Sequence, residues 1–311
     1  MIDIREVAKN IYMIDNRLFS IPAWGSVYVI NEEKKALVEC GPTTSVRFVL
    51  EGIRELNINP EDISYVIITH VHLDHAGGAG VLARHMPQAQ VVVHHKGARH
   101  LIDPARLIAG AIEARGSEVM VMHGEVLPIE MHQVQAVNEG DTISLSGQQT
   151  LRFIDAPGHA PHQLCIYETR NGGLFTGDAV GAYIAEHDII MPFHPPPQFD
   201  LQICLGTLQK LERFSARRIY YSHFGTSDRV KEHIDQARKK LMVWDDIVKK
   251  SIKEGVFTDT RARLIDQACA DLSEIEGVVS LDPLYQYLIK NHIPMCADGH
   301  LDYYRKTLRL N

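Results

Sequence analysis

The sequence lacks the cysteine pattern of a disulfide scaffold or a thiolate zinc knot. It contains five cysteines among 311 residues, all widely spaced, and no Cys-x-x-Cys pair. An odd number of scattered cysteines argues against a disulfide framework. The simplest interpretation is that they are small buried thiols in a reducing cytoplasm.

Long charged runs and long apolar runs are also absent. The net charge is −7, from 32 basic and 39 acidic residues, and no basic run occurs, so nucleic acid is not expected as a partner. No apolar stretch reaches the length of a membrane span. The first six residues lack the basic-then-apolar order of a secretory signal. We therefore expect a cytoplasmic protein that acts on a small-molecule substrate, with no membrane partner.

What the sequence does contain is a dense group of candidate metal ligands at residues 70–75, His-x-His-x-Asp-His. The apolar run 65–68 before it predicts a buried strand, so the group lies where a strand ends and a Gly-rich loop begins. On an extended backbone His70 and His72 project the same way and can bind one ion, while Asp74 and His75 lie past the turn and can face a second. Imidazole and carboxylate ligands without thiolate suit zinc, iron or manganese. The alternative is a His-rich loop without metal.

Three later strand ends each carry one more candidate ligand beside a glycine. The predicted strand 150–155 leads to His159, the strand 173–176 leads to Asp178, and the strand 218–221 leads to His223. At a strand end a side chain can reach a shared rim while the backbone turns tightly. Each residue alone could be an ordinary turn residue, but the four features in this order favour one site.

Together these motifs resemble the metallo-β-lactamase-fold hydrolase superfamily over residues 1–225, and among its branches the hydroxyacylglutathione-hydrolase-like, uncharacterised members. The resemblance implies an α/β fold, an αββα sandwich of the metallo-β-lactamase type, here with a C-terminal helical extension. Residues 222–225 read Ser-His-Phe-Gly where glyoxalase II proteins usually have Pro-Gly-His-Gly. This departure keeps the ligand but differs from the pattern of glutathione thioester hydrolases.

The resemblance also implies a ligand set and two divalent metal ions, with zinc favoured and iron or manganese as alternatives. The first ion would be held by His70, His72 and His159, the second by Asp74, His75 and His223, and Asp178 would bridge them.

Such a site predicts hydrolysis of an ester, thioester or lactone-type bond. Two divalent ions bind a bridging water and lower its pKa towards neutrality, so hydroxide is available at pH 7. Asp74 would be the catalytic residue that orients this water or collects its proton. The alternatives on the same fold are a phosphodiesterase, a mono-iron sulfur dioxygenase or other redox enzyme, and a non-catalytic binding module. A flavodiiron reductase is the less favoured redox alternative, because those proteins need a glutamate where this chain has His72 and also contain a flavodoxin domain.

Candidate substrate-binding residues occur in loops that flank the predicted metals. Trp24 belongs to an early loop, and Tyr183, His187 and His194 follow the bridging aspartate. Each could equally be structural. His162, three residues after His159, could support a metal ligand or be a plain loop residue, and the second interpretation is favoured.

The sequence predicts two domains, a catalytic domain over 1–227 and a helical extension over 228–311. In the first we expect a hairpin of strands 26–30 and 36–40, helices over 44–56 and 200–214, and one or two helices in 98–115, broken around residues 103–104. Apolar residues repeat at helical spacing over 228–254, and further helices are predicted over 259–275, 283–290 and 301–309. The extension would cap the core, cover the site or form a homodimer contact.

Overall fold

The computed structural model describes residues 2–273 and 282–309 and divides the chain into two compact units. The sheet unit comprises Met1–Ala156, Pro161–Gly177 and Ser215–Val230. The helical unit comprises Pro157–Ala160, Asp178–Phe214 and Lys231–Asn311. The two units are interleaved along the chain, and the domain boundary between residues 227 and 228 stays a prediction.

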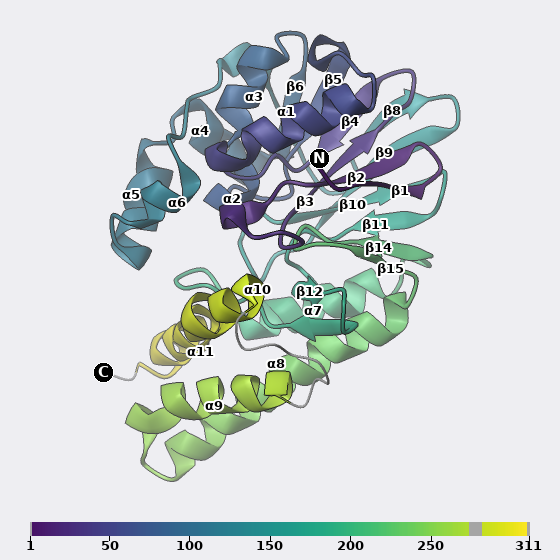
Figure 1. The fold of residues 1–311 in the computed structure, drawn as a ribbon. Coiled ribbons are helices and arrows are strands. Elements are labelled where there is room, and N and C mark those ends of the chain that lie inside the picture. Colours follow the sequence, from purple (N-terminus) through teal and green to yellow (C-terminus); the bar gives the residue numbers. More distant parts are fainter. Residues whose placement is uncertain (1, 274–281, 310–311) are drawn as a thin grey trace. The chain divides into compact units, whose positions relative to one another are not determined.

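The sheet unit contains two sheets, of which the first has seven strands that follow one another in sequence order (Figure 1). They are β1 (Ile4–Ala8), β2 (Ile11–Asp15), β3 (Ser26–Ile30), β4 (Lys35–Val38), β5 (Ile63–Ile67), β6 (Gln90–His94) and β7 (Val134–Val137). Strands β1 to β4 are antiparallel neighbours, whereas β4 to β7 run parallel. The predicted hairpin is confirmed as β3 and β4, but β4 ends at Val38 because Glu39 has a left-handed φ of 69°.

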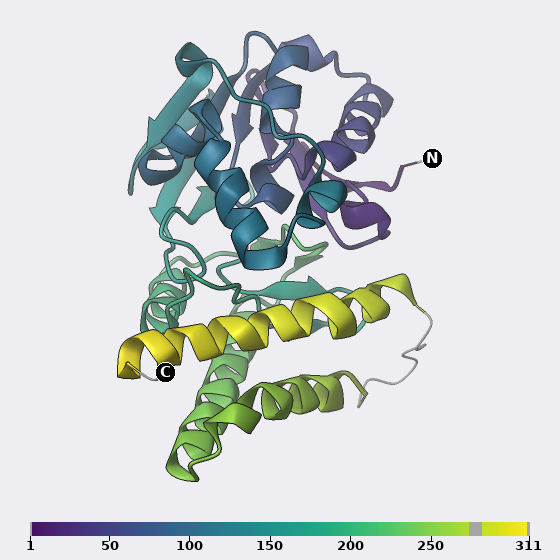
Figure 2. The ribbon, with the colours of Figure 1, turned by 90° about the vertical axis from the view of Figure 1, so that its left-hand side faces the viewer.

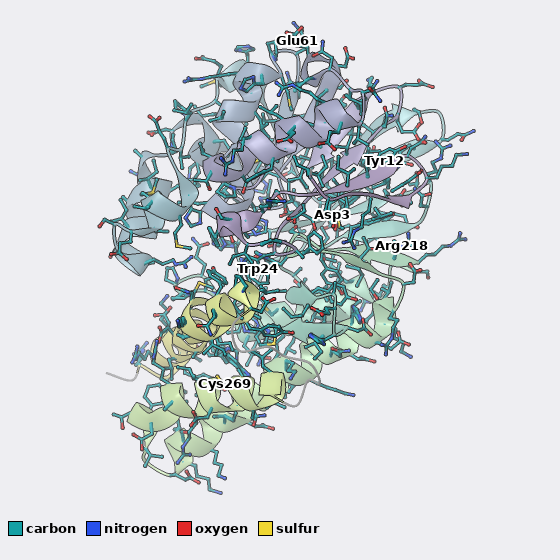
Figure 3. All side chains as sticks on the ribbon, in the orientation of Figure 1. Asp3, Tyr12, Trp24, Glu61, Arg218 and Cys269 are labelled. Carbon is teal, nitrogen blue, oxygen red and sulfur yellow. The ribbon has the colours of Figure 1, made fainter. Side chains whose placement is uncertain are left out.

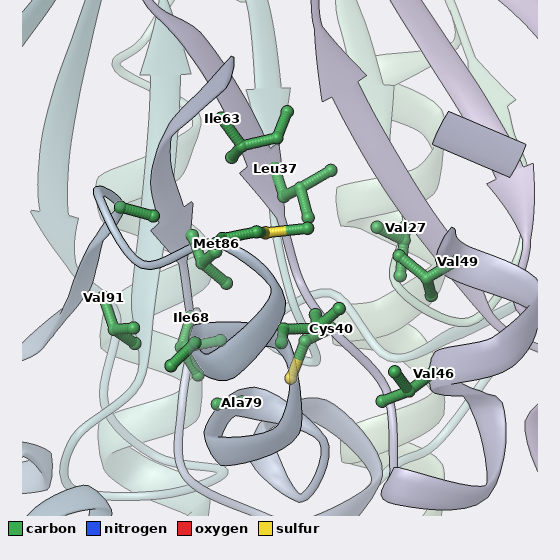
Figure 4. Close-up of a cluster of buried hydrophobic side chains, with 14 of the residues drawn as sticks. Val27, Leu37, Cys40, Val46, Val49, Ile63, Ile68, Ala79, Met86 and Val91 are labelled. Carbon is green, nitrogen blue, oxygen red and sulfur yellow. The ribbon is translucent and has the colours of Figure 1, made fainter. Parts of the chain in front are cut away.

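Side chains of this first sheet alternate between two cores. Val91 and Val93 of β6 belong to a cluster that also contains Val49 and Met86 (Figure 4), whereas Val92 belongs to a cluster shared with the second sheet. Because successive side chains of a strand point to opposite faces, a sheet covered on both sides needs continuously apolar strands. This explains the apolar runs in the sequence.

The second sheet has six strands in the order β15-β14-β11-β10-β9-β8. They are β8 (Thr142–Ser146), β9 (Gln149–Asp155), β10 (Leu164–Glu168), β11 (Gly173–Phe175), β14 (Arg218–Tyr220) and β15 (Thr226–Ser227). Only the β11–β14 pair is parallel. Phe153 of β9 and Phe175 of β11 pack with Tyr28 of β3 between the sheets.

The helices of the sheet unit lie close to their predicted positions. Helix α1 (Val46–Glu55) lies within the predicted range 44–56 and is shorter by two residues at its start and one at its end. Helix α3 (Ala79–His85) follows the ligand cluster. The predicted break at residues 103–104 separates α4 (His95–Ile102) from α5 (Ala105–Arg115), and α6 (Val119–His123) comes next.

In its described residues, the helical unit combines a short hairpin with five α-helices. These are β12 (Ala182–Ile184), β13 (Ile189–Met191), α7 (Leu201–Leu211), α8 (Val230–Lys253), α9 (Thr260–Ser273), α10 (Pro283–Tyr287) and α11 (Ile293–Leu308). Helix α11 packs against α9, with an Arg261–Asp298 ion pair of 2.5 Å (Figure 2). The last two residues of the predicted helix 259–275 lie outside the described residues.

Helix α11 begins at Ile293, well before the predicted start at residue 301. A π-helical turn, Leu288–His292, continues α10 directly into it, and Pro294 lies in the first turn, where the missing N–H costs little. Of the described helices, none is both long and apolar enough to span a membrane.

We expect Phe153→Ala to destabilise the sheet unit by about 3–5 kcal/mol, the usual cost of deleting a buried phenyl ring. Phe153 is fully buried between the sheets. As a control, Met131→Ala changes a side chain that is 71% exposed and should stay within about 0.5 kcal/mol of the parent protein. Urea unfolding followed by fluorescence measures both. A loss below 1 kcal/mol for Phe153→Ala would contradict this packing.

Candidate metal centre

Strand β5 and the single turn α2 (Leu73–Ala76) carry the histidine cluster. The strand ends at Ile67, and His70 follows it, fully buried, with Nε2 at 3.0 Å from Nδ1 of His72. His72 is the N-cap residue of α2, whose first turn contains Asp74 and His75. The helical turn directs Asp74 and His75 away from the strand direction, so the two pairs can face different positions.

His223 joins Asp74 and His75 from the far end of the sheet unit's sequence. The ligand atoms of these three residues, which we call the Asp74 corner, all lie within 4.8 Å of one another. Oδ2 of Asp74 is 3.7 Å from Nε2 of His75 and 3.8 Å from Nε2 of His223. The rings of His70 and His75 are 4.1 Å apart between centroids. Five of the seven predicted ligands therefore gather within the sheet unit.

Glu39, which was not among the predicted site residues, is a buried carboxylate behind the corner. Its Oε1 accepts hydrogen bonds from the hydroxyls of Thr69 at 2.5 Å and Ser222 at 2.7 Å. Nδ1 of His75 lies 3.0 Å from the same oxygen, so the carboxylate holds the proton on Nδ1 and leaves Nε2 towards Asp74. The available signal was an acidic residue at the end of an otherwise apolar strand.

His162 also lies in this cluster, contrary to its interpretation as a plain loop residue. Its ring centroid is 6.0 Å from that of His72 and 6.3 Å from that of His70. The Val71 N–H donates to Nδ1 of His162 over 3.4 Å. His162 therefore helps to support the loop between His70 and His72.

The other two predicted ligands meet in the helical unit. Nε2 of His159 is 3.3 Å from Oδ2 of Asp178, and both side chains are buried. Nδ1 of His159 lies 2.8 Å from the Phe193 carbonyl oxygen, which can only accept, so the Nδ1–H donates to it and Nε2 faces the carboxylate.

Helix α7 fixes the loop that carries His159. The Thr207 hydroxyl donates to the Pro157 carbonyl over 2.6 Å, and the Asp200 amide donates to the Gly158 carbonyl over 2.8 Å. Gly158 has a φ of +126°, and a Cβ there would lie 2.5 Å from Sγ of Cys204. Only glycine allows this approach, which explains the Pro-Gly-His signal.

Of the predicted substrate residues in the helical unit, His194 lies beside the His159–Asp178 pair. All three line a cavity of about 20 Å³, large enough for one water molecule. Burial lowers the pKa of His194 well below its usual value, so its ring is neutral at pH 7. Tyr183 instead donates from its hydroxyl to Asp188 over 2.9 Å, and the His187 ring lies 5.9 Å from that of Tyr285. Their role in substrate binding stays a prediction.

Trp24, labelled in Figure 3, lies against the Asp74 corner within the sheet unit. Its ring is fully buried, and its centroid is 4.7 Å from that of His223. This position is consistent with a residue that lines the second predicted ion site.

Known proteins resemble this chain in sequence. It is 26% identical over 155 residues to the uncharacterized protein YobT of Bacillus subtilis, a match that spans 49% of this chain and 60% of that protein. It is 25% identical over 225 residues to the metallo-beta-lactamase fold-containing protein ST1585 of Sulfurisphaera tokodaii, covering 70% and 80%. It is also 28% identical over 162 residues to an anaerobic nitric oxide reductase flavorubredoxin of Salmonella arizonae, covering 51% and 29%. The match thus covers less than two thirds of YobT and less than one third of the flavorubredoxin.

The fold and the family follow from two further comparisons. The crystal structure of ST1585 superposes with a TM-score of 0.69 at 20% identity, covering 93% of this chain and 97% of that one, which confirms the predicted fold class. The hydroxyacylglutathione-hydrolase-like branch stays a prediction. The family model described as "Metallo-beta-lactamase superfamily" matches residues 25–223, more than half of the sequence, and this chain therefore belongs to that superfamily.

Proposed function

We propose that this protein is a hydrolase that uses two divalent metal ions, preferably zinc, to cleave an ester, thioester or lactone-type bond of a small molecule. The Asp74 corner carries the proposal, because its carboxylate oxygen lies 3.7 and 3.8 Å from two imidazole nitrogens. Ligand atoms around a tetrahedral zinc ion lie roughly 3.4 Å apart. The corner therefore has the dimensions of a ligand cage.

The chain next to His159 and Asp178 supports their assignment to the same centre. The loop with His159 joins β9 to β10, and the Leu164 amide at the start of β10 donates to the Thr69 carbonyl over 2.8 Å. Gly177, directly before Asp178, is so close to Thr69 that a Cβ there would lie 2.7 Å from its Oγ1. Thr69 directly precedes His70. The sequence neighbours of both ligands are thus anchored beside the histidine cluster.

The donor set fits two divalent ions of borderline softness, since it consists of imidazoles and carboxylates without a thiolate. His70, His72 and His159 would hold one ion, Asp74, His75 and His223 the other, and Asp178 both. Bound ions would act as Lewis acids and lower the pKa of coordinated water, which makes a nucleophile available near neutral pH.

Asp74 has a second role in this proposal. Its side chain is 13% exposed, so it is the most accessible carboxylate of the cluster and can reach a water molecule that enters from solvent. A carboxylate there can orient the attacking water and accept its proton, which general-base catalysis requires. Glu39 acts only through His75, by fixing the orientation of that ring.

Metal content distinguishes the hydrolase from the redox alternative that the flavorubredoxin match suggests. We expect two zinc or manganese ions per chain in purified protein, because seven ligands exceed the needs of one open tetrahedral site. Elemental analysis measures this, and a panel of thioester, lactone, ester and phosphodiester substrates then identifies the bond cleaved. One ion per chain that does not increase on incubation with excess zinc or manganese would contradict the dinuclear proposal. Bound iron with no hydrolysis of the panel would favour redox chemistry.

Asp178→Ala should be the most damaging single change, because one carboxylate is proposed to contact both ions. Asp74→Asn keeps the shape but removes the charge, and we expect at least a 10²-fold loss of rate, the low end for a positioned proton-transfer group. His85→Ala is the control, since His85 is exposed at the end of α3. Rates are measured together with metal content. Full activity of Asp178→Ala with two ions bound would refute the site.

Glu39→Gln should weaken metal binding by about 10- to 100-fold, the usual effect of losing a carboxylate behind a ligand histidine. The amide cannot accept from the Thr69 and Ser222 hydroxyls and from His75 at once. Glu168→Gln is the matched control, because Glu168 is an equally buried carboxylate that accepts from Gln149 and from the Gly173 amide. Zinc titration against a chelator gives both affinities. Equal weakening in the two variants would mean that general destabilisation is the cause.

A further inference from the structure

Helix α6 carries a histidine that has no role in the proposed function and that lies near the Asp74 corner. His123, the last residue of α6, is 2% exposed. Burial lowers the pKa of His123, and the negative charge of Asp74 partly opposes this shift. The His123 ring is therefore neutral at pH 7.

The position of His123 is fixed by hydrogen bonds to the loop before α1. The Thr44 hydroxyl donates to the Met122 carbonyl over 2.8 Å. The Thr43 hydroxyl lies 2.6 Å from the Glu125 carbonyl and 3.0 Å from the Gly77 carbonyl. Gly77 directly follows α2, which carries Asp74 and His75. The end of α6 is thus held to Thr43 and Thr44, and Thr43 also contacts the end of the turn that carries Asp74 and His75.

The His123 ring has a defined hydrogen-bonding character. Nδ1 is 2.7 Å from the Val119 carbonyl oxygen, which can only accept, so Nδ1 carries the proton. Nε2 of the neutral ring is then an acceptor. Among residues 2–273 and 282–309, no hydrogen-bond partner for this Nε2 is found. A lone pair is therefore available for a group that binds beside the corner.

A strained aromatic loop lies against the same place. Phe19 contacts His123 edge to face, with ring centroids 5.0 Å apart, and Trp24 of the same loop packs on His223. The loop is closed by a bond from the Asn16 amide to the Gly25 carbonyl, and the Asp15 carboxylate accepts from the Arg17 and Ala23 amides.

Backbone strain in this loop is unusually dense. Four non-glycine residues, Arg17, Phe19, Ser20 and Ala23, have φ values between 48° and 65°. Such strain persists where surrounding bonds impose it, and it is concentrated at functional sites.

We propose that His123, Phe19 and Trp24 form a substrate subsite beside the Asp74 corner, in which Nε2 of His123 accepts a hydrogen bond from an uncharged N–H or O–H group of the substrate. Phe19, which is only partly buried, contacts the apolar part of that substrate, and the buried Trp24 supports the subsite from behind by packing on His223. This inference rests on the proposed function and narrows it to neutral esters, thioesters or lactones with a donor close to the cleaved bond. A substrate carboxylate in the same position is disfavoured, because its oxygen and Nε2 of His123 are both acceptors and cannot form a hydrogen bond with each other.

The test compares two 4-nitrophenyl esters, of N-acetylglycine and of N-acetyl-N-methylglycine, which differ in one N–H donor. We expect the metal-loaded protein to prefer the N–H ester by about tenfold in kcat/KM, the effect of one neutral hydrogen bond. His123→Asn keeps a donor for the Val119 carbonyl but has no atom at Nε2, so the preference should fall to about twofold or less. His123→Gln puts an amide oxygen near Nε2 and should restore most of the preference.

The outcome that overturns the subsite is an unchanged preference in His123→Asn, or an equal loss for both esters together with a lower metal content. The second result would mean that His123 only supports the fold.

A binding measurement separates this inference from the hydrolase proposal. In protein labelled with ¹⁵N-histidine, the Nε2 resonance of His123 should move on addition of the ketone analogue of the N–H ester, and not with its N-methyl counterpart. If neither ester is hydrolysed but this specific shift occurs, the hydrolase proposal fails and the subsite is supported. If the esters are hydrolysed without preference and no shift occurs, the subsite is wrong and the hydrolase proposal stands.

Discussion

The hydrogen bond from the Leu164 amide to the Thr69 carbonyl is the contact on which the site's construction depends. It joins the start of β10 in the second sheet to the end of β5 in the first, directly before the histidine cluster. The Thr69 hydroxyl also donates to Glu39, and Gly177 packs against the same side chain. Loops from both sheets therefore start next to Thr69, directly before the histidine cluster.

Charge explains why the centre would hold ions rather than remain a hydrogen-bonded network. Glu39 is buried, Asp74 is mostly buried and Asp178 is buried, and moving carboxylates out of water is costly unless cations compensate. Neutral imidazoles offer lone pairs but no positive charge. In the proposed site the formal charge of two divalent ions exceeds that of the three carboxylates by one, which favours a substrate that becomes anionic during the reaction.

Residue spacing carries information about the part of the candidate site that is local in sequence. The His-x-His-x-Asp-His spacing predicted the gathering of His70, Asp74 and His75, because strand and turn geometry are local. The role of Glu39 could not be predicted in this way, because a single acidic residue forms no spacing pattern with its neighbours in sequence. Its three hydrogen-bond partners lie far from it in the sequence. His123 was missed for the same reason, because only α6 packing against residues 43–44 brings it to the corner.

The path of the chain between its two units has a consequence for how the protein can be divided. The chain passes from one unit to the other after residues 156, 160, 177, 214 and 230. Neither unit is therefore a contiguous fragment, and a single cut cannot release either one intact. Metal ions that bind the native protein and not the unfolded chain would raise its resistance to unfolding, by an amount that grows with the concentration of free metal.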